Sequence, residues 1–121
     1  MAELTGNQRR SLHVLAYMLF RMGQEKRARK IYAGLAALAP EKKPDRMALA
    51  GLAAIAIESG EGGRALEYLR AAMDGAVLSS KHAALHFMKA QALWLEGRTA
   101  EAEAAKDEYL FLKGSSAEND A

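Results

Sequence analysis

The chain has 121 residues, of which 50% are apolar and 26% charged, values that are ordinary for a single soluble globular domain. It contains no cysteine, which excludes disulfides, zinc–thiolate sites and cysteine nucleophiles. Only two prolines occur, alanine is abundant and β-branched residues are few, so the composition favours helix over sheet.

The formal net charge is only +2, but the two signs are unevenly placed. Residues 1–46 carry ten Lys or Arg and four Asp or Glu, a net of +6, whereas residues 47–121 carry seven and eleven, a net of −4. This polarity suggests a charged partner, and the plainer alternative is a basic helix face exposed to water. The basic stretch 26–30 has no interleaved aromatics, so nucleic acid is not the expected partner.

Membrane and export signals are not evident in the chain. No apolar run has the length of a membrane span, and residues 1–7 lack an apolar signal region. We therefore expect a cytoplasmic protein without direct membrane insertion.

Apolar periodicity and helix-breaking residues predict six helices, at about 7–22, 25–39, 46–59, 63–76, 81–96 and 100–113. Asp45 is placed to cap the third helix, Ser79 or Ser80 the fifth, and Thr99 the sixth, which we expect to end at Gly114. We expect residues 1–114 to form a single domain and residues 115–121 a flexible polar tail.

A pattern of small residues repeats three times at an interval of 37 residues. An alanine is followed by a glycine seven residues later and by a second alanine five residues after that: Ala16, Gly23 and Ala28; Ala53, Gly60 and Ala65; Ala90, Gly97 and Ala102. Glycine leaves the right-handed helical region at least cost, and alanine lets two helices approach closely. The pattern therefore predicts three helical hairpins with a glycine in each turn.

This spacing resembles the tetratricopeptide repeat, a 34-residue helix–turn–helix unit, with units at about 9–42, 46–79 and 83–116. The first unit follows the repeat pattern well, and the second has Val77 in place of the terminal proline. The third departs at His86, Lys89 and Lys106, which puts the packing of the last hairpin in doubt. The resemblance implies an all-α fold of three hairpins stacked as a short right-handed solenoid.

In that family the first helix of each pair lines a concave groove. Carrying the groove positions over yields a largely apolar and aromatic set, which includes the single tryptophan: Arg10, His13, Tyr17, Phe20, Arg21, Met47, Ala54, Ile57, Phe87, Gln91, Trp94 and Leu95. An apolar surface of this kind is expected to bind a partner. The alternative is that the aromatics complete the core of a very short array.

The end of the sixth helix carries apolar residues on more than one face. Tyr109 and Phe111 predict a second interface, covered by a partner chain or by a second copy of this chain. The alternative is that Phe111 is simply an exposed aromatic.

The sequence offers little that would support catalysis. His82 and His86 are four residues apart, half of a metal site, but no third ligand accompanies them. Phosphate-cradling loops and nucleophile motifs are not found. We therefore expect no metal, no cofactor and no enzymatic activity.

Several stretches resemble the YscY (SctY) family of small type III secretion chaperones. They are residues 8–12 (QRRSL), 22–28 (MGQEKRA), 38–41 (LAPE), 89–93 (KAQAL) and 109–113 (YLFLK). The resemblance implies a cytoplasmic chaperone, peripheral to the inner membrane, that binds the small secreted protein SctX and brings it to the export gate SctV. The alternative is a generic tetratricopeptide adaptor or oligomeric scaffold in another pathway. On either function, self-association is expected when the partner is absent.

Overall fold

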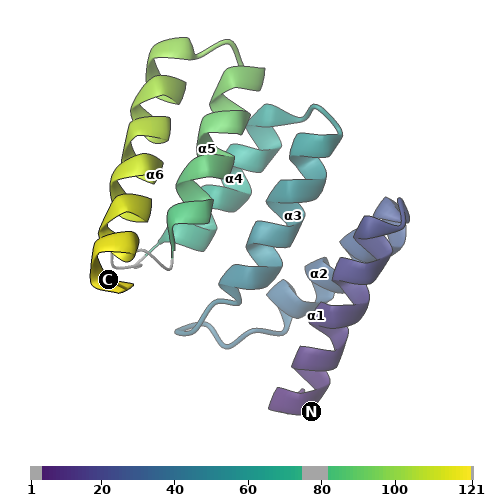
Figure 1. Ribbon diagram of the computed structural model, residues 1–121. Coiled ribbons are helices and arrows are strands. Elements are labelled where there is room, and N and C mark those ends of the chain that lie inside the picture. The colour runs from purple at the N-terminus through teal and green to yellow at the C-terminus, as the bar shows by residue number, and fades with distance from the viewer. Residues whose placement is uncertain (1–3, 75–81, 121) are drawn as a thin grey trace.

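The computed structural model describes residues 4–74 and 82–120, and every element within them is helical. The helices are α1 (Gly6–Arg21), α2 (Glu25–Ala37), α3 (Arg46–Glu58), α4 (Gly62–Met73), α5 (Ala83–Leu95) and α6 (Thr99–Asp120). They form three antiparallel hairpins that lie side by side in chain order (Figure 1). The expectation of an all-α fold is confirmed for the described residues.

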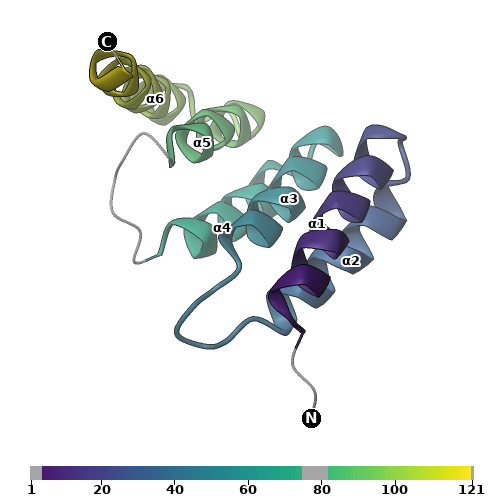
Figure 2. The same cartoon turned by 60° about the horizontal axis from the view of Figure 1, so that its bottom comes forward.

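Each helix packs against its neighbours in the chain, and the contact between α5 and α6 is the most extensive. The odd-numbered helices also meet, because α3 contacts both α1 and α5. Within the described residues no such contact joins α2, α4 and α6 to one another. Two views show α1 and α2 at the opposite end of the row from α5 and α6 (Figures 1 and 2).

The three hairpin turns share one backbone geometry. Gly23, Gly60 and Gly97 have φ of +79°, +75° and +75°, the left-handed region that glycine adopts without a Cβ penalty. The residue after each glycine donates its N–H to a carbonyl five residues earlier, at N–O distances of 2.8 to 2.9 Å. The predicted role of the three glycines is confirmed.

The alanines of the repeating pattern lie where helices approach one another. Ala16, Ala28, Ala53 and Ala65 are fully buried, and Ala102 is nearly so. Ala90 is only half-buried. Both paired alanines are therefore buried in the first two hairpins, whereas in the third Ala90 stays partly exposed.

Two arginines link the ends of a hairpin at the 37-residue interval. Arg9 donates from Nη2 to the carbonyl of Leu35 at 2.7 Å, and Arg46 donates from Nη1 to the carbonyl of Ala72 at 2.5 Å. In the third hairpin the arginine position is occupied by an alanine, so this link is missing there. The hairpin nevertheless forms, with buried Leu93, Ala102 and Ala105 in its core.

The helix boundaries differ from those predicted at several ends. The predicted end of α6 at Gly114 is wrong, because the helix continues through Gly114 to Asp120. Glycine inside a helix costs only about 1 kcal/mol relative to alanine, so it does not by itself end one. Thr99 is the first residue of α6 rather than its cap. The proposed caps Ser79 and Ser80 lie outside the described residues, and the division of the chain at residue 114 stays a prediction.

Candidate functional site: an apolar pocket between α3, α5 and α6

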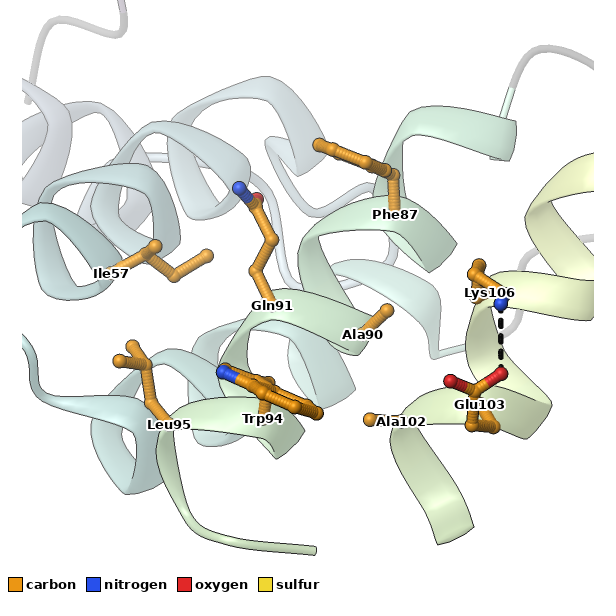
Figure 3. A pocket seen from close by; sticks show the side chains of 9 residues that line it. All are labelled: Ile57, Phe87, Ala90, Gln91, Trp94, Leu95, Ala102, Glu103 and Lys106. Carbon is orange, nitrogen blue, oxygen red and sulfur yellow. Dashed lines mark ion pairs between the residues drawn. The ribbon is translucent and has the colours of Figure 1, made fainter. Parts of the chain in front are cut away.

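An open pocket of about 470 Å³ lies where the end of α3 meets α5 and α6. Five of the predicted groove residues come together in it: Ile57, Phe87, Gln91, Trp94 and Leu95. Four further residues that were not predicted complete the lining: Ala90, Ala102, Glu103 and Lys106. Figure 3 shows the α5 side chains along one wall and those of α6 opposite them.

The wall contributed by α5 is apolar and open to water. Trp94 is 65% exposed, and Phe87 and Leu95 are each 46% exposed. Three large apolar side chains close together on one helix exceed the isolated exposed residues that are normal on a surface. The pocket therefore exposes a cluster of large apolar side chains to water.

Small residues make the hollow. Ala90 and Ala102 face one another across the hairpin, and neither fills the space between the wall of α5 and the rim of α6 (Figure 3). They are the two alanines of the third repeat of the small-residue pattern. In this hairpin the pattern helps to form a cavity as well as a helix contact.

The rim on α6 is polar. Lys106 Nζ lies 2.8 Å from Glu103 Oε2, and both side chains are about half exposed. Lys106 is one of the positions that depart from the tetratricopeptide pattern, so this departure was the available sequence signal for the polar rim. An ion pair at the edge of an apolar hollow can accept hydrogen bonds from a ligand backbone or donate to it.

Tyr109 of α6 contacts Phe87, one of the aromatic residues that line the pocket. Its ring centroid lies 5.2 Å from that of Phe87, with the planes tilted by 51°. Lys113 Nζ lies 5.7 Å from the centre of the same Tyr109 ring. Tyr109, predicted at a second interface, is thus half-buried against α5, whereas Phe111 is 68% exposed.

The remaining predicted groove residues do not line this pocket. Arg10, Tyr17, Arg21 and Met47 are exposed on α1 and α3. Phe20 is half-buried and packs against the core between the first two hairpins, and Ala54 is half-buried on α3. For Phe20 the alternative reading, an aromatic that completes the core, describes its surroundings best.

His13 belongs to a polar cluster between the first two hairpins. Its Nε2 lies 2.9 Å from Asp45 Oδ2, which Arg9 Nη2 also reaches at 2.5 Å. Asp45 Oδ1 accepts from the backbone N–H of Ala48 at 3.0 Å, so its predicted role as the cap of α3 is confirmed. Sequence reasoning did not identify Arg9, since only the fold brings it to Asp45.

Opposing effects act on the pKa of Asp45. Burial raises it, but the hydrogen bonds from the Ala48 N–H, His13 and Arg9 outweigh burial and leave the pKa lower than usual. The carboxylate is therefore ionised at neutral pH and joins α1 to the start of α3. This gives His13 a structural role in the described molecule.

A second, more polar pocket of about 710 Å³ lies between α4, α5 and α6. Its lining includes His86, which is buried and whose Nε2 has no hydrogen-bond partner in the described structure. Burial lowers the pKa of His86, nearby Lys89 and His82 lower it further, and Glu108 opposes them. The ring is therefore neutral near pH 7 and occupies a position that the repeat pattern assigns to packing.

Comparison with known proteins yields no match to the chain, neither among the family models nor among the curated proteins. Of the described helices, none combines the length and apolar character needed to cross a membrane. Within residues 4–74 and 82–120, no group of three or more His, Cys, Asp or Glu side chains is placed to hold a metal ion. The absence of cofactor and catalysis stays a prediction.

Proposed function

We propose that this chain is a protein-binding module that holds an apolar segment of another protein in the pocket between α3, α5 and α6. The observation that carries the proposal is the exposure of Trp94, Phe87 and Leu95 around one hollow. Large aromatic side chains in a water-accessible pocket are the typical anchors of protein–protein interfaces. The occupant would bury the indole and the Phe87 ring and meet the Glu103–Lys106 rim with polar groups.

The finer proposal is a tetratricopeptide-type solenoid. Three features support it: the 37-residue interval of the turn glycines, the contacts among odd-numbered helices, and the lack of such contacts among α2, α4 and α6. In such an array the odd-numbered helices form the inner layer, and the pocket lies on α5 at one end of it. The groove positions on α1 and α3 would extend the binding surface beyond the pocket.

The resemblance to the YscY (SctY) family suggests what the module does. The chain would act as a type III secretion chaperone that binds an SctX-like protein and helps to dock it on the export gate SctV. A client that is disordered alone would fold on binding, so that chaperone and client stabilise each other. The rival is a tetratricopeptide adaptor or scaffold in another pathway, for which the pocket would serve a different partner.

Co-expression with an SctX-like protein from the same genome tests whether that protein is the client of this chain. We expect a stable complex from wild type and, for Trp94→Ala, a Kd raised at least about 30-fold, since loss of a central aromatic anchor costs about 2 kcal/mol or more. Trp94 is the only tryptophan, so its fluorescence reports occupancy directly: burial in the complex should shift its emission to the blue.

The matched control is Leu38→Ala, which removes a large exposed side chain far from the pocket lining. It should bind as wild type does. A complex that forms with unchanged affinity in Trp94→Ala would contradict the pocket. Failure of wild type to bind any SctX-like protein would contradict the chaperone assignment and leave the adaptor as the better proposal.

A further inference from the structure

The outward face of α1 carries a second exposed apolar surface. Val14 is 55% exposed, Leu15 45% and Met18 54%, and Met22 beside them is also exposed. The other three residues follow Val14 by one, four and eight positions, a spacing that places all four along one stripe of the helix. We call these four residues the α1 stripe.

The repeat shows what kind of element such a face receives. A shift of 37 residues carries the α1 stripe positions 14, 15 and 18 onto Gly51, Leu52 and Ile55 of α3. There the same face is covered by α2: Leu52 and Ile55 share one buried cluster with Tyr32 and Leu35. A Cβ at Gly51 would lie 2.6 Å from the Tyr32 ring. The α1 stripe is therefore the face that, one repeat later, accepts a helix.

The charge of α1 indicates the chemistry of that helix. The sequence of α1 contains three arginines and no acidic residue. Arg10 and Arg21 are exposed, and neither forms an ion pair with a described residue. They are eleven residues apart, about 16 Å along the helix, and flank Val14 on one side of the stripe. A complementary helix would carry acidic residues about three turns apart.

A second copy of this chain is a poor occupant. Two α1 helices in contact would bring arginines together without a counter-charge. In head-to-tail stacking, α6 would take the place of α2, and a shift of 74 residues puts Lys106 at the position of Tyr32. Lys106 is half exposed and paired with Glu103, so it would set a charged group against the apolar stripe.

We propose that the α1 stripe is a docking site for an amphipathic helix of another protein whose apolar face is flanked by acidic side chains. The helix would lie on α1 as α2 lies on α3, with Arg10 and Arg21 pairing with its carboxylates. This site is separate from the pocket on α5, although Arg10 and Arg21 at its edge also belong to the predicted groove positions on α1.

Two peptides test the proposal on the full chain. One has the native sequence of residues 24–39, and the other has the same sequence with Lys26, Arg27, Arg29, Lys30 and Ala37 replaced by Glu, so that two glutamates stand eleven residues apart. Both keep the face that carries Tyr32 and Leu35, so they differ only in charge. Calorimetry or fluorescence anisotropy should show the acidic peptide binding wild type at least tenfold more tightly than the native one.

Protein variants locate the site. Met18→Glu should weaken binding of the acidic peptide at least tenfold, and the Arg10→Glu, Arg21→Glu double variant should prefer the native basic peptide instead. Trp94→Ala, which alters the pocket proposed above, should leave peptide binding unchanged. Leu110→Glu serves as the control for an added charge, because Leu110 on α6 is as exposed as Met18, at 54%. Circular dichroism establishes that each variant is folded.

Several results would overturn the docking site. No binding of the acidic peptide at up to millimolar concentration would do so, as would equal binding of the two peptides. Loss of binding in Trp94→Ala rather than in Met18→Glu would place the peptide in the pocket. Self-association of wild type that Met18→Glu abolishes would show that a second copy covers the stripe.

Discussion

At the residue scale, one carboxylate joins α1 to the start of α3. Asp45 caps α3 through the Ala48 N–H and also receives Arg9 and His13 from α1. Arg9 extends the link to α2 through the Leu35 carbonyl. The connection between the first two hairpins thus rests on apolar packing and on one well-satisfied acidic side chain.

Asp45→Ala should lower the free energy of unfolding by about 2–4 kcal/mol, because it removes a helix cap and leaves Arg9 without its counter-charge. Asp45→Asn keeps a capping oxygen and should cost about half as much. The pKa of Asp45 is lowered in the folded chain, so its stabilisation is present above about pH 4 and is lost as the pH falls through the folded value. Urea denaturation of wild type and both variants at pH 7 and pH 3 measures these costs and their pH dependence. If Asp45→Ala lost the same stability at both pH values, the ionised carboxylate would not be what stabilises the fold.

His86 differs from Asp45, because its buried Nε2 has no hydrogen-bond partner in the described structure. Its pKa is lowered by burial, so the unfolded chain binds the proton more readily than the folded one. Stability should therefore fall as the pH drops through about 6.5 towards the folded value. His86→Leu, which restores the type of residue at the equivalent Leu12 and Leu49, should raise stability by about 1 kcal/mol and remove this pH dependence. Denaturation curves of wild type and His86→Leu at pH 5 and pH 8 test this prediction. If the stability of the variant depended on pH as that of wild type does, His86 would not be the titrating group.

At the element scale, a glycine allows α2 and α3 to approach each other closely, but not every helical glycine has this role. Gly34 in α2 has nothing within 4 Å of the position of a Cβ, whereas a Cβ at Gly51 in α3 would overlap the ring of buried Tyr32. Both glycines lie inside helices with ordinary backbone angles, so they differ in packing and not in conformation.

Gly34→Ala should stabilise the chain by about 0.5–1 kcal/mol through helix propensity. Gly51→Ala should destabilise it by about 1–3 kcal/mol, because α2 and α3 must move apart or Tyr32 must leave its site. Thermal denaturation of the two variants measures this difference, because each is the same substitution in a helix and only the packing around it differs. Two shifts of the same sign would show that close approach of α2 and α3 is not what glycine provides at position 51.

At the scale of the whole molecule, each hairpin depends on its neighbours. The first and third hairpins make no helix contact with each other among the described residues, and the second contacts both. Stability should then be distributed as in a short linear array, in which the central unit couples the two ends.

Hydrogen exchange of two leucine variants measures this coupling. Leu69→Ala, in the central hairpin, should reduce protection in all six helices, because Leu69 is buried in the cluster that joins α3, α4 and α5. Leu112→Ala, in α6, should reduce protection mainly in α5 and α6. Uniform loss in both variants would indicate one fully cooperative domain instead.

Features that depend on residues close together in the chain could be predicted from the sequence. The apolar periodicity identified all six helices, the three glycines adopt positive φ, and Asp45 caps α3. Helix ends were less predictable: Gly114 was expected to stop α6 but does not, because it keeps a helical φ where Gly23, Gly60 and Gly97 adopt a positive one. Of the predicted groove, Ile57, Phe87, Gln91, Trp94 and Leu95 line one pocket.

The sequence by itself determined the repeating hairpin, since the turn geometry and helix periodicity depend on residues close together in the chain. The tertiary structure alone decided which exposed side chains meet. The pocket needs Ile57 of α3 and the rim of α6 beside α5, and the Asp45 cluster needs Arg9 and His13 from 36 and 32 residues away. It also decided which apolar face is covered: among the described residues α2 covers this face in α3, whereas the α1 stripe is exposed.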